Sequence, residues 1–381
     1  MFTGGGGAGS AYVPTFVAVV VNSVSFNWDP GTSTQDGMTL KEDLPANATI
    51  PVPEWQLLPS RNYAAAYWGG TRPIIEASIS VYPPTASVAI QPRSEKCPTP
   101  GAMPTCFPPL NGQIVSGSSM KVDIPFANDL PSRVFPIMDS ILWYSLSPEN
   151  GKIIKRIRLR TGPHSIYVLD PYRPPVDLME HPLAEVLRYS TYLVSSDYYS
   201  GINDSDLLKS LGRNLYRNAW KDDPDFGNMN YIAYDALQHK YILFFGFSSY
   251  FFHIMTFLDD LRLSQNGFIT ADCWTVAGFY KSLANSLGVN SDILEFSGSL
   301  DTVSIWPIGH ITSESTVHWD THATTVYPNS DGNIYEATFE LYNYPIKLEL
   351  FDKDKSYYKS HVFITPINDI AEHPQTIYLD Y

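Results

Sequence analysis

The chain has 381 residues, a formal net charge of −14 and a pI near 5.0. A hydrophobic share of 44% and an aromatic share of 14% are typical of a globular protein, and the length suffices for two domains. The acidic balance argues against a nucleic-acid partner and against an anionic membrane surface, because both require clustered Lys and Arg.

The first part of the chain, residues 1–170, has the pattern of short β-strands. Apolar and polar residues alternate in Ile74–Tyr82, which is the period of a half-buried strand. Turn residues separate this run from its neighbours at intervals typical of a sandwich. The other short runs are 16–21, 87–90, 120–124, 141–144 and 153–159. We therefore expect an Ig-like or related β-sandwich over residues 1–170, with a possible binding role.

Two of the three cysteines, Cys97 and Cys106, flank a short Pro-rich stretch and are expected to form a disulfide. Such a bond indicates an oxidising compartment, so we expect a secreted, periplasmic or cell-surface protein. The alternative is two free thiols in a surface loop of a cytosolic protein. The glycine run at residues 4–7 does not resemble a secretory signal, which has a basic segment and an apolar core.

Helical periodicity begins after a linker at residues 170–176, which carries three prolines. Apolar residues then recur at helical spacing near residues 183–194 and 207–215, and strand-like runs follow towards the C-terminus. This order predicts an α+β domain over residues 171–381. An apolar stretch at 241–258 approaches the length of a membrane span, but Gly246, Ser248, Ser249 and His253 interrupt it. A buried strand or helix is the favoured interpretation, and a membrane partner is not expected.

The third cysteine, Cys273, stands where a helical pattern begins. Thr270 or Asp272 can cap the start of this helix, and Gly288 is placed to end it. A thiol in the first turn is stabilised as a thiolate, so the position favours a nucleophile with a lowered pKa. The alternative is a small buried cysteine that packs as a hydrophobic side chain.

A β-hairpin downstream of Cys273 supplies a histidine and a carboxylate. If residues 328–332 form its loop, Tyr327 faces Asn333 and Glu336 becomes a diagonal neighbour of His322. A histidine oriented by a carboxylate and close to a thiol is the minimal Cys–His–acid arrangement for nucleophilic catalysis.

Two alternatives concern this hairpin. Asp331 could replace Glu336 as the acid, although its place in the turn favours a role in shaping the turn. His318, Asp320 and His322 could share one face of a strand and bind a metal ion, but a well-spaced further ligand is missing, so we expect no metal site.

The segments around these residues resemble the transglutaminase-like, papain-related superfamily over residues 235–345. The helix that opens with Asp272-Cys273-Trp274 is similar to the nucleophile helix, the run after His322 to the histidine strand, and residues 332–338 to the closing strand. The resemblance implies Cys273 as nucleophile, His322 as general base and acid, and Glu336 as orienting acid. It also implies an oxyanion donor upstream of the cysteine, for which the candidates are Gln265 and Asn266.

Two functions from different classes follow from this resemblance. The first is a thiol-dependent enzyme that transfers acyl groups of a protein or peptide substrate, as a protease, deamidase or transglutaminase, without a cofactor. The second is an inactive copy of the fold that serves as an extracellular binding or structural module, because the family usually has Asp where this chain has Glu336. The sequence leaves the oligomeric state open.

Overall fold

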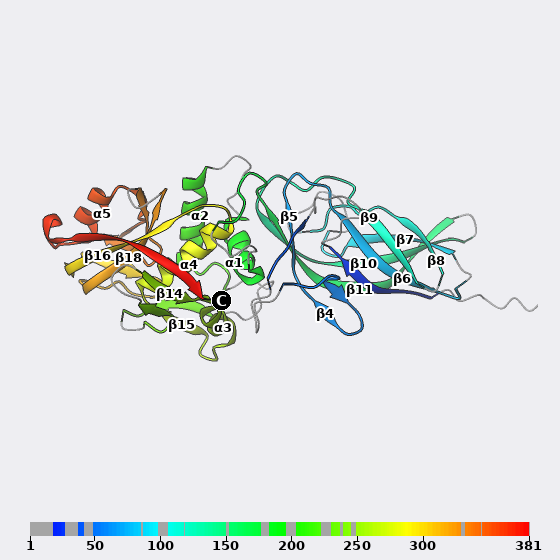
Figure 1. Ribbon diagram of the computed structural model, residues 1–381, viewed down its shortest axis with the longest axis horizontal. Helices are drawn as coiled ribbons and strands as arrows, with labels where there is room; N and C mark the ends of the chain where they lie inside the picture. Colours follow the sequence, from blue (N-terminus) through cyan, green and yellow to red (C-terminus); the bar gives the residue numbers. More distant parts are fainter. Residues whose placement is uncertain are drawn as a thin grey trace, which may run out of the picture.

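The computed structural model of the chain (Figure 1) describes these residues: 18–26, 37–41, 49–84, 87–97, 106–117, 119–149, 152–176, 183–195, 203–221, 230–236, 239–244, 249–328, 332–343 and 345–380. Within them the chain is rich in β-sheet. The strand-rich N-terminal part and the helix-containing C-terminal part lie side by side in Figure 1, and the strands of the first give way to helices between Leu169 and Ala184.

Two sheets form the N-terminal part. The order in the first is β4 (Arg61–Asn62), β3 (Trp55–Gln56), β1 (Ala18–Ser25), β6 (Ile74–Tyr82) and β9 (Met120–Pro125). The order in the second is β2 (Gly37–Met38), β5 (Ala65–Trp68), β11 (Lys152–Leu169), β10 (Phe135–Glu149), β7 (Ser87–Ser94) and β8 (Gln113–Ser116). Neighbouring strands are antiparallel except for the parallel pair β5 and β11.

Both sheets contribute to one hydrophobic core, so they pack face to face as two layers. Ile79 of β6 lies in this core together with Ile141 of β10 and Ile166 of β11. The alternation in β6 predicted one buried face, and that face is buried. On the opposite face Glu76 and Ser80 are buried, while Tyr82 is exposed. The strand lies between β1 and β9 and is therefore a central one.

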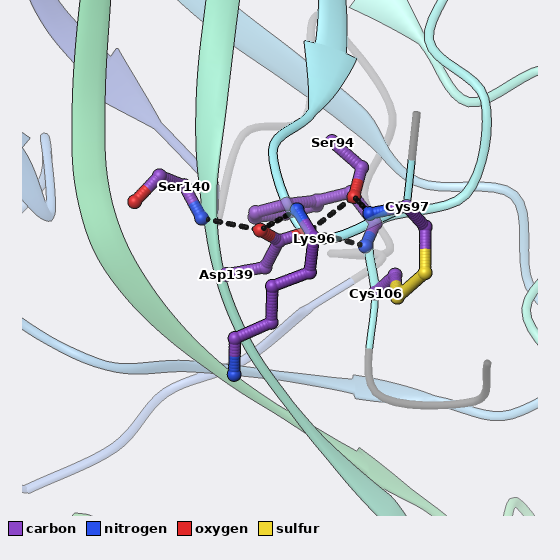
Figure 2. The surroundings of a disulfide bond; sticks show 7 residues. Ser94, Lys96, Cys97, Cys106, Asp139 and Ser140 are labelled. Atoms are coloured by element: carbon purple, nitrogen blue, oxygen red, sulfur yellow. Dashed lines mark hydrogen bonds between the residues drawn. A yellow bond between two sulfur atoms is a disulfide. The ribbon is translucent and has the colours of Figure 1, made fainter. Parts of the chain in front are cut away.

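A buried carboxylate fixes the loop that carries the disulfide between Cys97 and Cys106. This disulfide is present, as expected. Figure 2 shows the Asp139 carboxylate beside it, accepting hydrogen bonds from the backbone N–H groups of Lys96 (3.0 Å) and Ser140 (2.7 Å). The N–H of Phe107 and the hydroxyl of Ser94 also donate to Asp139. The carboxylate thus holds both ends of the disulfide loop on β10.

The C-terminal part combines helices with a seven-stranded sheet. Its helices are α1 (Ala184–Ser195), α2 (Asp204–Tyr216), α3 (Ile254–Leu263), α4 (Cys273–Ser286), α5 (Lys355–Val362) and the 3₁₀ turn Ile367–Asp369. The sheet order is β13 (Ile242–Phe244), β14 (Ser249–His253), β23 (Ala371–Asp380), β16 (Asp292–Asp301), β18 (His318–Tyr327), β19 (Asn333–Tyr335) and β22 (Phe351–Lys353). A parallel pair, β12 (Tyr231–Tyr234) and β15 (Phe268–Ala271), and a three-stranded sheet, β17 (Ile305–Pro307), β20 (Phe339–Asn343) and β21 (Ile346–Leu348), complete it.

Helix α4 is the centre of the second core. It packs against β16 and β18 on one side and against α1 and α2 on the other. Every described side chain of the helix except Lys281 is buried, which confirms the buried helix predicted from the sequence. Gly212 of α2 permits this approach, because a Cβ at that position would lie 2.8 Å from the Tyr280 hydroxyl. The same core extends across the junction to Met138 and Leu169 of the N-terminal sheets.

The described residues of the apolar stretch at 241–258 belong to β13, β14 and the start of α3, so the expected strand and helix are present. Tyr250, Phe252 and Phe257 are buried as expected, but Leu243 and Phe244 of β13 are about half exposed, and residues 245–248 lie outside the described residues. In the described parts of the chain, no helix has both the length and the apolar character needed to cross a membrane.

We expect the substitution Asp139→Ala to lower the free energy of unfolding by about 3 to 5 kcal/mol, because four donors around the disulfide lose a buried charged acceptor. Urea denaturation under non-reducing conditions, followed by circular dichroism, measures this change. Asp129→Ala is the matched control: its carboxylate pairs with Arg72 at the surface, where such a pair contributes about 1 kcal/mol or less. Equal effects of the two substitutions would contradict the structural role of Asp139.

Candidate active site

Local signals place Cys273 at the first position of α4. Asp272 caps the helix: its backbone is extended and its carboxylate accepts a hydrogen bond from the Thr275 N–H at 2.8 Å. At the other end Gly288 has a φ of +81°, and its N–H bonds to the Asn285 carbonyl. Both ends therefore coincide with the signals in the sequence. The Cys273 thiol is almost fully buried, with 5% of its residue surface exposed.

Burial raises the pKa of the Cys273 thiol well above its ordinary value, and the negative charges of Asp272 and Glu336 act in the same direction. Hydrogen bonds from the backbone N–H groups of Ala323 and Trp274 lower the pKa, but they do not offset burial. The sequence predicted a lowered pKa from the helix N-terminus, and that prediction is wrong. Loss of solvation outweighs the helix N-terminus at this depth, so the resting group is a neutral thiol.

The hairpin brings His322 and Glu336 together. Tyr327 pairs with Asn333, as expected, but the ladder ends at Thr325 and Tyr335. Although Glu336 therefore lies beyond the paired residues, its carboxylate accepts a hydrogen bond from His322 Nε2 at 2.8 Å. Both side chains are completely buried, with exposures of 0% and 1%.

Two further donors complete the coordination of the Glu336 carboxylate. The Tyr358 hydroxyl of α5 donates to the same oxygen as His322, at 2.6 Å, and the Thr338 N–H donates to the other oxygen at 2.7 Å. Burial by itself raises the pKa of Glu336, but the charge of His322 and these hydrogen bonds prevail and lower it. Glu336 is therefore an ionised acceptor at neutral pH.

The remaining ring nitrogen of His322 is directed to no partner in the described part of the chain. This nitrogen, Nδ1, is buried and makes no hydrogen bond there. Trp319 stacks on the imidazole with ring centroids 4.7 Å apart, and Phe339 lies 5.3 Å from it. Because Nε2 is committed to Glu336, the neutral imidazole has Nδ1 as its proton acceptor.

The thiol lies beside the histidine strand. Helix α4 packs against β18, and the Ala323 backbone, next to His322 in the chain, acts on the pKa of the thiol. The structure therefore places Cys273, His322 and Glu336 in one buried region. The chemistry available there is proton transfer from a thiol to an imidazole whose opposite nitrogen is held by a carboxylate.

Three residues near the thiol were missed by the sequence analysis. Tyr358 is one; nothing in the sequence connects α5 with the hairpin. Tyr234 is the second: it pairs with Ala271 across the parallel strands β12 and β15, and its buried hydroxyl finds no acceptor among the described residues. Burial raises the pKa of Tyr234 well above its usual value, and Cys273, when it is ionised, acts in the same direction with the next largest effect.

His239 is the third. Its half-exposed ring is hydrogen-bonded through Nδ1 to the Asp272 carboxylate, so a second imidazole lies next to the helix cap that precedes Cys273. The hydrogen bond with Asp272 raises the pKa of His239. Burial lowers this pKa, but its effect is smaller.

Gln265 and Asn266, the candidates for the oxyanion donor, are exposed in the turn between α3 and β15. The four residues of β15, which span about 13 Å of extended chain, lie between this turn and the start of α4. The structure therefore does not bring either side chain to the thiol. The spacing of residues along the sequence could not show that Tyr234, rather than Gln265 or Asn266, lies near the thiol. Tyr234 comes close to it because β12 pairs with β15.

The structure also bears on the two alternatives at the hairpin, a metal site at the histidines and Asp331 as the acid. His318 and Asp320 are exposed, and His318 Nδ1 lies 2.9 Å from Asp301, whereas His322 points into the core. Within the described ranges, no cluster of three or more His, Cys, Asp or Glu side chains could hold a metal ion. Asp331 lies outside the described residues.

We expect Glu336→Gln to lower the free energy of unfolding by about 2 to 4 kcal/mol at pH 7, because three buried donors lose their charged acceptor. The folded-state pKa of Glu336 is below its ordinary value, so its contribution is complete above the unfolded pKa of about 4.3 and is lost as the pH falls through the folded one. Urea denaturation between pH 7 and pH 3.5 should show the two proteins converging in acid. Glu95→Gln, an exposed partner of Arg160, is the control and should change stability by about 1 kcal/mol or less.

No protein-family model matches the chain, and no curated protein matches it in sequence. Among solved structures, the chain is similar to the crystal structure of red sea bream transglutaminase, with 10% sequence identity and a TM-score of 0.30. The match covers 71% of this chain and 49% of that one, so the chain spans about half the length of the transglutaminase. At this TM-score the likeness is weak: it is compatible with a transglutaminase-like fold and carries no argument about activity.

Proposed function

We propose that the chain is a thiol-dependent enzyme that transfers acyl groups from peptide or amide bonds, with Cys273 as nucleophile, His322 as base and Glu336 as orienting acid. The observation that carries the proposal is the hydrogen bond between His322 Nε2 and Glu336 at 2.8 Å, which leaves the buried Nδ1 without a hydrogen-bond partner among the described residues. A buried imidazole held in one tautomer by a carboxylate is the arrangement that a thiol nucleophile requires.

The raised pKa of Cys273 specifies the order of proton transfer. The thiol is neutral before substrate binds, so its proton moves to His322 Nδ1 as the sulfur attacks the acyl carbon. The imidazolium, stabilised by Glu336, then protonates the departing amine, and a thioester remains on Cys273. Water or a second amine attacks the thioester with His322 as base, which releases an acid or a new amide and restores the thiol.

Tyr234 is the side chain that we assign to the oxyanion. The negative charge of the tetrahedral intermediate needs donors close to the thiol, and the Cys273 N–H at the helix N-terminus is one. The Tyr234 hydroxyl is the second: it is buried near Cys273, and its raised pKa keeps it protonated as a donor. This assignment replaces Gln265 and Asn266.

The second candidate function is a binding or structural module that retains the fold without catalysis. Its supporting observation is the burial of the thiol, which leaves Cys273 5% exposed with a raised pKa. The disulfide between Cys97 and Cys106 supports an extracellular or periplasmic location for either candidate.

Alkylation by iodoacetamide separates the two candidates without a known substrate. If His322 accepts the thiol proton, Cys273 should react about tenfold faster in the wild type than in His322→Gln between pH 6 and pH 8, as measured by mass spectrometry of the labelled peptide. The substitution also opens space near the thiol, which would favour the variant by access alone. Equal rates, or a faster variant, would contradict the role of His322 as base.

A glutaminyl peptide supplied with a fluorescent primary amine tests the transfer step, and ammonia release from the same peptide tests hydrolysis. We expect Tyr234→Phe to lower kcat about 100-fold with little change in KM, because it removes one oxyanion donor. Tyr241→Phe is the matched control, since its hydroxyl bonds to Asp260 instead. Equal activity of the Tyr234→Phe variant and the wild type would exclude Tyr234 as the donor, and Cys273→Ser must abolish both reactions.

A further inference from the structure

A hollow of about 280 Å³ lies at the opposite end of β12 from Tyr234. It is bounded by the end of α2, the start of β12, β17 with the turn that follows, and β21. The lining residues that matter here are Tyr216, Arg217, Lys221, Tyr231, Trp306 and Lys347.

The charge of this hollow is opposite to that of the chain. The sequence has 39 acidic and 25 basic side chains. Nevertheless Arg217, Lys221 and Lys347 line the hollow, and none of the described residues lining it is acidic. All three cations are exposed. Such a local excess of positive charge in an acidic protein raises the concentration of anionic ligands at one place on its surface.

Two of the cations are held over aromatic rings. The Lys347 ammonium lies 3.5 Å from the centroid of the Trp306 ring, and the Lys221 ammonium lies 4.6 Å from that of Tyr231. Contacts of this kind hold an ammonium in place without using its N–H donors. The donors therefore remain available for the oxygen atoms of an anion.

Among the described residues, three acids lie close to this lining: Glu349 and Glu340 beside the cations, and Glu314, which pairs with His310 at 3.2 Å. Glu349 binds Arg213 in two hydrogen bonds of 2.7 and 2.8 Å, whereas its distance to Arg217 is 3.5 Å. Glu340, largely buried, is the other acid close to Lys347. Arg217 is therefore partly neutralised by Glu349, whereas Lys221 and Lys347 make no ion pair with a described residue and supply the available positive charge.

The walls of the hollow are fixed by hydrogen bonds. The Asn218 side chain bonds to both the N–H and the carbonyl of Ile232, at 2.7 and 3.0 Å, and joins the end of α2 to β12. Asn218 adopts a left-handed backbone conformation, with a φ of 51°, to do so. The Tyr216 hydroxyl donates to the Trp306 carbonyl at 2.9 Å. The hollow is therefore formed before any ligand arrives.

A second hollow, of about 360 Å³, continues along β12 to Tyr234. The two hollows share His310, whose ring bonds to the Tyr234 carbonyl at 2.9 Å. Tyr231 and Tyr234 are the ends of β12, and their side chains lie on opposite faces of the strand, Tyr231 partly exposed and Tyr234 buried. An extended peptide of about four residues, about 13 Å long, would reach along this strand from the first hollow into the second.

We propose that the cluster of Arg217, Lys221 and Lys347 is a subsite for acidic residues of a peptide substrate that extends along β12 from the first hollow into the second. The aromatic rings of Trp306 and Tyr231 provide the apolar floor for the peptide chain, and the three cations bind its carboxylates in charge-assisted hydrogen bonds. The identification of this ligand as a substrate rests on the proposed function.

Fluorescence anisotropy of a labelled decapeptide with four glutamates, against its glutamine counterpart, tests the subsite with the full chain. We expect the acidic peptide to bind at least about tenfold more tightly, and Lys221→Gln/Lys347→Gln to remove this preference, because two charge-assisted contacts are lost. Raising the salt concentration should weaken binding in the wild type more than in the variant. The control Arg72→Gln/Lys121→Gln removes two exposed cations of the N-terminal sheets and should leave binding unchanged.

Equal affinity for the two peptides, or an equal loss in the control variant, would overturn the proposal, as would full displacement of the acidic peptide by inorganic phosphate at equal concentration. Binding does not require the thiol, so the Cys273→Ser variant should bind like the wild type. If the acidic peptide binds but no variant or condition gives acyl transfer, the subsite stands and the proposed enzyme fails. If transfer occurs with no preference for acidic peptides, the enzyme stands and the subsite fails.

Discussion

The buried hydrogen bond between His322 and Glu336 constrains the whole candidate site. A carboxylate without solvent is strongly unfavourable unless donors surround it, and the fold supplies three, from β18, from α5 and from the segment after β19. These segments must therefore meet in one arrangement. The same arrangement fixes the tautomer of His322 and leaves its Nδ1 buried without a hydrogen-bond partner among the described residues.

Burial has opposite consequences for the pair of His322 and Glu336 and for the Cys273 thiol. It strengthens the pair of His322 and Glu336, because charges interact more strongly away from water. It also raises the pKa of Cys273 beyond what the helix N-terminus can lower. An enzyme built on this site would work through a neutral thiol and a proton transfer coupled to attack, whereas an inactive module would need the buried pair only for stability.

The small parallel pair of β12 and β15 lies between the proposed catalytic site and the proposed peptide-binding subsite. β15 leads into α4 and so delivers Cys273, while β12 carries Tyr234 at one end and Tyr231 at the other. The proposed oxyanion donor and the proposed acidic-residue subsite are therefore the two ends of one strand. Any change that shifts this strand should affect both.

The sequence alone predicted the features that depend on neighbours along the chain. Asp272 and Gly288 mark the ends of α4, and the alternation in Ile74–Tyr82 marks a strand. The pairing of Tyr327 with Asn333 was also expected from the sequence. Cys97 and Cys106, nine residues apart, also pair as expected. These features depend on hydrogen bonds and loop closure between residues close in the chain. They can therefore be predicted from the sequence alone.

Only the tertiary structure decided which groups surround the thiol. Tyr358 reaches Glu336 from 22 residues away, and Tyr234 approaches through a parallel strand, whereas Gln265 is left in an exposed turn. The pKa of Cys273 likewise depends on the solvent that the assembled core excludes. Burial and long-range contacts are properties of the packed chain, and for that reason residue spacing did not predict them.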